Sequence, residues 1–119
     1  MISWNDIYNS CKRLASLIED SDYKPDILIG LARSGFIPSR LLSDFLGNTN
    51  LYSLKVEHWL DMTAQHRDDA TVTCKLPIDV DGKTVLVIDD IVDTGKSMDV
   101  AIQYINSSKP LKVKSAVVH

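Results

Sequence analysis

The sequence predicts an α/β fold in which a twisted parallel sheet is flanked by helices. Short apolar runs alternate along the chain with segments of helical periodicity, which is the order expected of βαβ units. The run TVLVID (84–89) is apolar enough to be buried on both faces, as the strands of parallel sheets are. With 119 residues and no linker or repeat, the chain is predicted to form one domain over residues 1–119.

The composition argues against several classes of protein. Hydrophobic residues make up 45% of the chain and charged residues 24%, so the chain is predicted to fold. A net charge of -3 gives no electrostatic basis for nucleic acid as a partner. The sequence has neither a signal peptide nor a membrane-spanning run, so we expect a soluble cytoplasmic protein with no membrane partner. Cys11 and Cys74 lack metal-binding spacing and are expected to be free thiols.

Helical and strand patterns alternate in the first half of the chain. The start, SWND, resembles a capping box with Asp in place of Glu, and the apolar spacing after it predicts a helix over about 4–19. The run ILIGLA (27–32) predicts a strand that ends at the turn RSGF. A second helix is expected to begin at Pro38 and to end at Gly47, followed by a strand LYSLKV (51–56).

The second half begins with a segment that has no clear period. Residues 57–71 are of mixed polarity and predict either a long loop or a poorly ordered hairpin, with VTCKLP (72–77) as its return strand. Asp81-Gly82 marks a tight turn before TVLVID. A helix is then predicted over 97–105, and a proline separates it from the last strand, KVKSAVV (112–118).

The segment VLVIDDIVDTGKS (85–97) contains a turn suited to an anion. Ligands of open parallel sheets bind at the carboxyl ends of the strands, where a turn leads into the next helix. Here the turn DTGKS leads into a helix N-terminus, whose free backbone N–H groups and dipole favour a phosphate. Gly95 permits close approach of the backbone, and the hydroxyls of Thr94 and Ser97 can donate to phosphate oxygens. This part of the segment is predicted to bind a phosphate.

The carboxylates of the same segment require a second explanation, because they repel a phosphate. A Walker A loop does not provide it, since that pattern needs a glycine where Asp90 stands. Asp89 and Asp90 can instead accept hydrogen bonds from vicinal hydroxyls of a sugar. Magnesium carried by a diphosphate would offset their charge further. The segment therefore indicates a ligand with a phosphate, a diol and a metal-bound diphosphate.

VLVIDDIVDTGKS resembles the phosphoribosyl pyrophosphate (PRPP) motif of the type I phosphoribosyltransferases, and most closely that of the purine branch, which acts on hypoxanthine, guanine or xanthine. The resemblance implies a type I phosphoribosyltransferase core that transfers a phosphoribosyl group from Mg-PRPP to a purine base and releases pyrophosphate. It implies that Asp89 and Asp90 hold the ribose hydroxyls and contact Mg²⁺ indirectly, through PRPP. The implied ligands of the 5′-phosphate are Asp93, Thr94, Gly95, Lys96 and Ser97.

Asp93 has a further implied role. It matches the position whose carboxylate faces N7 of the purine in this branch and can accept its proton, which makes it the predicted catalytic residue. The same residue type is also a favoured N-cap of a helix, so a purely structural role stays open.

A second short loop supports the resemblance. Type I enzymes bind pyrophosphate with a loop after their first core strand, and LARSG (31–35) is similar to it. The implied pyrophosphate ligands are Ala32, Arg33, Ser34 and Gly35, where small residues let backbone amides point at the anion and Arg33 adds a positive charge. Family members often have a non-proline cis peptide here, which would fall between Ala32 and Arg33.

The resemblance also sets expectations for the rest of the chain. By position, residues 57–71 match the loop that closes over the reaction in these enzymes. His58, His66 and Arg67 are possible contacts to pyrophosphate, and none of them is singled out. Trp59 could contact the lid or a dimer partner, but a residue of this kind is more often simply packed. Family members commonly form dimers, so a homodimer is expected.

The purine enzymes continue into a hood that binds the base, and no such hood lies in the 119 residues. The hood is therefore expected to be absent, with the domain truncated at its C-terminus; a fragment of a longer enzyme and a natural short homologue both stay open. So do three functions: a purine phosphoribosyltransferase, a transferase for another base, and a non-catalytic PRPP-binding regulator.

Overall fold

The computed structural model describes residues 3–60, 68–90 and 96–118, and of residues 58–60 and 68–70 it describes the backbone alone. The elements are α1 (Trp4–Asp20), β1 (Ile27–Ala32), α2 (Phe36–Leu46), β2 (Leu51–Leu60), β3 (Asp68–Cys74), β4 (Thr84–Asp89), α3 (Lys96–Asn106) and β5 (Lys112–Val117). Strands and helices therefore alternate as predicted, apart from β2, β3 and β4, which follow one another without a helix between them.

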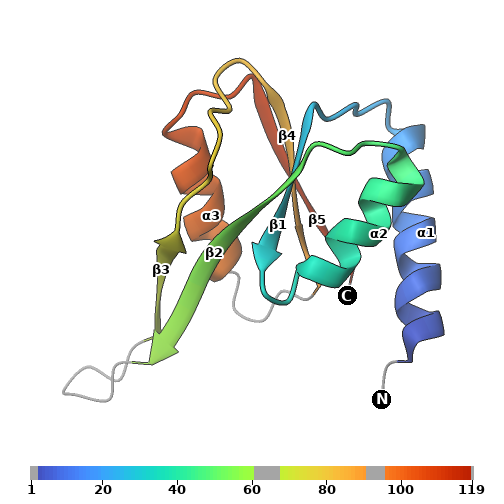
Figure 1. The fold of residues 1–119 in the computed structure, drawn as a ribbon, viewed down its shortest axis with the longest axis horizontal. Coiled ribbons are helices and arrows are strands. Elements are labelled where there is room, and N and C mark those ends of the chain that lie inside the picture. The colour runs from blue at the N-terminus through green and yellow to red at the C-terminus, as the bar shows by residue number, and fades with distance from the viewer. Residues whose placement is uncertain (1–2, 61–67, 91–95, 119) are drawn as a thin grey trace.

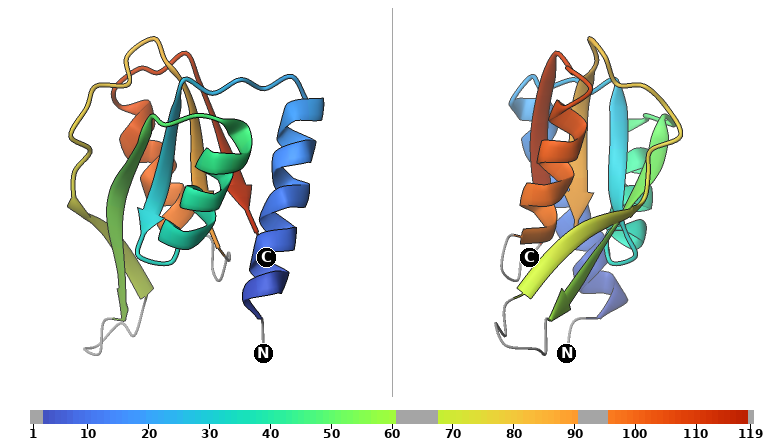
Figure 2. Two further views of the ribbon diagram at one scale, coloured as in Figure 1. Left: turned by 45° about the vertical axis from the view of Figure 1, so that its right-hand side comes forward. Right: turned by 90° about the vertical axis from the view of Figure 1, so that its left-hand side faces the viewer.

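The strands of the described residues form one sheet in the order β3-β2-β1-β4-β5 (Figure 1). Strands β2, β1, β4 and β5 are parallel, whereas β3 pairs with β2 in the antiparallel direction at one edge. Helices α1 and α2 cover one face of the sheet and α3 covers the other (Figure 2). The predicted α/β fold is confirmed, with an antiparallel edge strand added to a parallel sheet.

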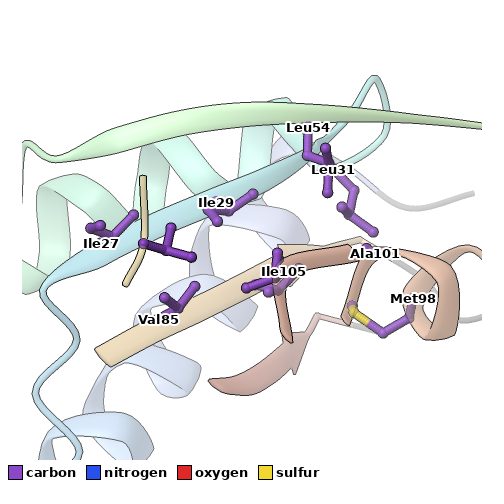
Figure 3. Packing of buried hydrophobic residues seen from close by; sticks show 10 residues of the cluster. Ile27, Ile29, Leu31, Leu54, Val85, Met98, Ala101 and Ile105 are labelled. Carbon is purple, nitrogen blue, oxygen red and sulfur yellow. The ribbon is translucent and has the colours of Figure 1, made fainter. Parts of the chain in front are cut away.

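Each face of the sheet has its own apolar cluster, because successive side chains of a strand point to opposite faces. On one face, Ile27, Ile29 and Leu31 of β1 pack toward α3 (Figure 3). On the other face, Leu28 lies in a cluster with residues of α1 and α2. Strands β1 and β4 are thus buried on both sides, which fixes their carboxyl ends relative to each other.

The helix boundaries follow local chemistry. The predicted capping box of α1 is present: the Asp6 N–H donates to the Ser3 hydroxyl, and the Ser3 N–H donates to the Asp6 carboxylate, both at 3.1 Å. Helix α2 begins at Phe36, so the predicted start at Pro38 is wrong by two residues. Proline is tolerated there because the N–H groups of the first turn have no partner within a helix. Gly47 ends α2, as predicted, and adopts the left-handed conformation.

The segment predicted as a loop or a hairpin over 57–71 is a hairpin where it is described. Strand β2 runs four residues past the predicted end, and β3 pairs with it through partners such as Glu57 and Thr71. The return strand predicted over 72–77 is wrong in its bounds, because β3 begins earlier and ends at Cys74. Backbone pairing with each other stabilises the end of β2 and the start of β3, so the apolar pattern of the sequence did not indicate the length of these strands.

Two expectations from composition can be compared with the structure. None of the described helices is both long and apolar enough to cross a membrane. Both cysteines are free thiols, as predicted: Cys11 is a buried residue of α1, and Cys74 is exposed on β3.

Candidate functional site

The candidate site lies where β1 and β4 end side by side. The chain leaves β1 toward β2 on one side and leaves β4 toward β5 on the other, so the direction of winding reverses between them. Such a switch point opens a crevice at the carboxyl ends of the strands, which is where open α/β sheets bind ligands. The register pairs Gly30 with Ile88, so the loop after β1 and the acidic residues after β4 leave the sheet at the same level. Two motifs separated in the sequence are thereby brought together.

The loop after β1 is tightly closed. The peptide bond between Ala32 and Arg33 is cis, as the resemblance implied. The Gly35 N–H donates to the carbonyl oxygen of Leu31 at 2.7 Å, and the Phe36 N–H donates to the carbonyl oxygen of Arg33 at 3.0 Å. The side chains of Arg33 and Ser34 stay exposed at the end of the sheet. A positively charged side chain therefore stands beside a compact loop, as an anion site requires.

Gly35 allows this loop to lie against β4. A Cβ at this position would be 2.6 Å from the carbonyl oxygen of Ile88 and 2.7 Å from that of Leu31. Distances this short to backbone atoms are not relieved by a change of side-chain rotamer. Only glycine fits between β1 and β4 without displacing one of them.

Asp89 ends β4 as a buried carboxylate, 7% exposed. Its Oδ1 accepts two hydrogen bonds, from the Ser34 hydroxyl at 2.7 Å and from the Asp90 N–H at 2.8 Å. Burial raises the pKa of the Asp89 carboxyl above its ordinary value, the two hydrogen bonds act in the opposite direction, and the nearby charge of Asp90 raises the pKa further. The two hydrogen bonds hold the Asp89 carboxylate in one orientation at the edge of the crevice.

Asp90 is held differently. Its Oδ1 is buried and has no hydrogen-bond partner among the described residues. A buried acceptor without a partner is costly, and such atoms in native proteins commonly mark a place for a ligand, an ion or a water molecule. The adjacent carboxylates thus differ: one is already hydrogen-bonded by the protein, and the other has an acceptor that a ligand can use.

The predicted phosphate-binding turn is described only in part. Asp93, Thr94 and Gly95 lie outside the described residues. Lys96 and Ser97 are the first two residues of α3, so the predicted helix N-terminus follows the motif directly. Of the candidates in the predicted lid, the side chains of His58 and Trp59 and the residues His66 and Arg67 also lie outside the description.

The carboxylates have the chemistry that Mg²⁺ requires, since this ion prefers oxygen ligands. The described residues contain no group of three or more His, Cys, Asp or Glu residues able to hold a metal ion. The carboxylate oxygens of Asp89 and Asp90 fit Mg²⁺ chemically.

Sequence reasoning missed the contact between the two motifs. Ser34 was predicted as a pyrophosphate ligand in a loop whose backbone amides point at the anion, with no role for its hydroxyl, which in the structure donates to Asp89 across the crevice. The order of strands is the signal that was available: residues that follow neighbouring parallel strands emerge at the same edge of the sheet.

A cavity of about 510 Å³ lies at the opposite end of the sheet, near the amino ends of β1 and β2 and the C-terminal ends of α1 and α2. Its charged residues are Glu19, Asp44 and Lys24. Two carboxylates and one ammonium group make it a poor place for a ligand with several phosphate groups. This cavity is therefore not the candidate site.

Comparisons of the sequence point to one family. A family model described as phosphoribosyl transferase domain matches residues 3–119. Hypoxanthine-guanine phosphoribosyltransferase of Saccharomyces cerevisiae is 24% identical over 96% of this chain and 58% of its own length. Xanthine-guanine phosphoribosyltransferase of Idiomarina loihiensis is 32% identical over 82% of this chain and 58% of its length. Bifunctional protein PyrR of Clostridium kluyveri is 28% identical over 86% of this chain. The chain spans a little over half the length of these curated relatives.

Solved structures agree with the sequence comparisons. A purine phosphoribosyltransferase from Pyrococcus horikoshii superposes with a TM-score of 0.83 at 30% identity, over 97% of this chain and 73% of that one. A hypothetical protein from Neisseria gonorrhoeae with bound ppGpp superposes with a TM-score of 0.86 at 26% identity, over 97% of this chain and 67% of that one.

Proposed function

Because the chain belongs to the phosphoribosyl transferase domain family, we propose that it is a purine phosphoribosyltransferase, which transfers a 5-phosphoribosyl group from Mg-PRPP to a purine base and releases pyrophosphate. The observation that carries the proposal is the position of two carboxylates, Asp89 and Asp90, beside the loop formed by residues 32–35, across the crevice between β1 and β4. A diol and a diphosphate attached to one sugar would meet these two groups at once.

The proposed ligand contacts follow from the chemistry of each group. Asp89 and Asp90 accept hydrogen bonds from the ribose hydroxyls, and the buried Oδ1 of Asp90 gains the partner that it lacks. The loop from Ala32 to Gly35 holds pyrophosphate with its backbone amides and the Arg33 guanidinium. The turn that leads into α3 holds the 5′-phosphate.

The proposed reaction exchanges one bond at the anomeric carbon of the sugar for another. The bond to the pyrophosphate oxygen breaks, and its electron pair leaves with pyrophosphate. A nitrogen of the purine forms the new bond with its lone pair, and the base loses a proton, for which Asp93 is the proposed acceptor. When bound, Mg²⁺ neutralises charge on the diphosphate; Asp89 and Asp90 are the residues that would contact it, indirectly, through PRPP. Arg33 adds charge compensation as pyrophosphate departs.

A regulator that binds PRPP or a related nucleotide without turnover is the second candidate. Two observations favour it: a relative is named as the bifunctional protein PyrR, and one structural neighbour holds ppGpp. Since ppGpp carries diphosphate groups on a ribose, the same crevice suits it chemically. A transferase that acts on a different base is a third possibility within the same family. Assembly as a homodimer and a cytoplasmic location belong to the proposal as well.

The chain spans only 58% of the length of the yeast relative, so it could bind PRPP without catalysing the transfer. The test therefore measures binding and transfer separately. The purified chain is incubated with PRPP, Mg²⁺ and a mixture of purine and pyrimidine bases, and nucleotide products are identified by mass. Calorimetry on the same sample measures binding of PRPP and of ppGpp. The variant with Asp89→Asn and Asp90→Asn is the matched control.

Each outcome of this test supports a different function. A purine nucleotide made by the wild-type chain and not by the control supports the proposal. A pyrimidine nucleotide contradicts the purine preference and favours the third possibility. PRPP or ppGpp binding without any product contradicts transfer by this chain and favours the regulator. Binding of neither compound contradicts both the enzyme and the regulator.

A further inference from the structure

We propose that Ser34 is a positioning residue that orients the Asp89 carboxylate toward the ribose, so that the two halves of the site act as one unit. This inference rests on the proposed function and adds to it. The family resemblance implies that Ser34 is one of the four loop residues, 32–35, that bind pyrophosphate. The geometry assigns its hydroxyl to the carboxylate on the other side of the crevice, at 2.7 Å.

The first step of the argument concerns the acceptor sites of Asp89. Each oxygen of a carboxylate has two lone pairs directed at donors in the carboxylate plane. The Ser34 hydroxyl and the Asp90 N–H both donate to Oδ1. With Oδ1 engaged twice, the plane of the carboxylate is fixed, and a ribose hydroxyl is directed to Oδ2. Without the Ser34 hydroxyl, the Asp90 N–H would be the single hydrogen bond that the described residues donate to Oδ1.

The second step concerns the contact between the loop and β4. Gly35, next to Ser34, fits against the carbonyl oxygen of Ile88, next to Asp89, with no room for a Cβ. The backbone contact and the side-chain hydrogen bond therefore join consecutive residues of the loop to consecutive residues of β4. An anion that displaces the loop necessarily displaces the donor of the Asp89 hydrogen bond. Binding at the loop and binding at the carboxylates are thus linked through Ser34.

The third step distinguishes Asp89 from its neighbour. Asp89 is buried and carries two hydrogen bonds from the protein, whereas Asp90 has a buried oxygen with none among the described residues. A carboxylate oriented before binding does not lose rotational freedom when the ligand arrives. Ser34 supplies this orientation for Asp89, whereas Oδ1 of Asp90 has no such donor among the described residues. Loss of Ser34 should therefore weaken recognition of the sugar.

Ligand fragments separate this role from direct contact with pyrophosphate. Ribose 5-phosphate has the diol and no diphosphate, whereas pyrophosphate is the diphosphate without the sugar. Positioning by Ser34 predicts that Ser34→Ala weakens binding of ribose 5-phosphate by about tenfold, which is the typical effect of losing a hydrogen bond to a charged group. Binding of Mg-pyrophosphate should change less than about twofold, because the backbone amides of the loop and Arg33 are retained.

Two further variants complete the test, and calorimetry measures all of them. Ser34→Thr keeps the hydroxyl and should restore ribose 5-phosphate affinity to within about twofold of the wild type. On an Asp89→Ala background, Ser34→Ala should cause little additional loss, because its acceptor is already gone. The control is Ser16→Ala on α1, where the exposed hydroxyl donates only to a backbone carbonyl oxygen of its own helix. It should change neither affinity.

The outcomes distinguish this inference from the proposed function. If Ser34→Ala lowers pyrophosphate affinity and leaves ribose 5-phosphate affinity unchanged, Ser34 is a direct ligand and the inference is overturned. It is also overturned if the alanine variant binds PRPP and both fragments as the wild type does, a result that leaves the proposed function intact. A wild-type chain that binds neither PRPP nor ribose 5-phosphate refutes the proposed function, and the inference with it.

Discussion

Gly35 lies directly against the carbonyl oxygen of Ile88, and a Cβ on this glycine would be 2.6 Å from that oxygen. Gly35→Ala therefore has to displace either the loop after β1 or the end of β4. We expect the free energy of unfolding to fall by about 1–3 kcal/mol, the usual cost of inserting a methyl group into a packed site. PRPP affinity should fall at least tenfold. Chemical denaturation and calorimetry measure the two effects.

Gly47 provides the matched control for this prediction. It adopts a left-handed conformation at the end of α2, and no atom lies within 4 Å of the place that a Cβ would take there. Gly47→Ala should cost about 1–2 kcal/mol through backbone strain alone and should leave PRPP affinity unchanged. Equal effects of both variants on PRPP binding would show that Gly35 acts only through stability.

The paired carboxylates carry the second prediction. Replacing both Asp89 and Asp90 by Asn keeps their shape and removes their charge. We expect PRPP affinity to fall by at least tenfold, since hydrogen bonds to charged acceptors are roughly twice as strong as neutral ones. The fold should be retained, because burial disfavours the charged form of Asp89 in the ligand-free protein. Calorimetry together with circular dichroism tests this, and unchanged PRPP affinity would exclude both residues as ribose ligands.

The raised pKa of Asp89 predicts how stability depends on pH. Since the pKa in the folded state lies above the ordinary value of 3.8, the folded protein binds this proton more tightly than the unfolded chain. The resulting stability is fully present below 3.8 and is lost as the pH rises through the folded-state pKa.

The measurement is the free energy of unfolding of the ligand-free wild type and of Asp89→Asn, from about pH 4 to pH 7. The difference between them isolates the titration of Asp89, because other groups contribute similarly to both. Wild-type stability should decline relative to the variant as the pH rises. If wild-type stability instead rises relative to the variant as the pH rises, the hydrogen bonds from Ser34 and Asp90 lower the pKa of Asp89 by more than burial raises it.

The sequence predicted the core elements well because their signals are local. The capping box at Ser3 and Asp6, the apolar run of β4 and the left-handed Gly47 each act within a few residues of the chain. The hairpin of β2 and β3 was predicted poorly because the end of β2 and the whole of β3 are defined by pairing with each other at the side of the sheet, which local apolar patterns do not indicate.

The site was predicted as two separate motifs, and its internal contact was not. A sequence motif shows which residues follow one another along the chain. The hydrogen bond between Ser34 and Asp89 joins residues 55 positions apart, so neither motif indicates it. It depends on the order of the strands, on the closed loop and on the absence of a side chain at Gly35. These properties arise only after the sheet has formed, so no local pattern contains them.

Asp93 carries the last prediction, which follows from the resemblance and from the turn before α3. If its carboxylate accepts the proton of the base, Asp93→Asn should lower turnover by about 10²–10⁴-fold, the usual contribution of a general base. PRPP affinity should fall much less, because the neighbouring amides and hydroxyls still hold the phosphate. Steady-state kinetics with the preferred base, together with PRPP calorimetry, separates the two effects. Losses of equal size would instead indicate a helix N-cap, whose removal disturbs the phosphate-binding turn as a whole.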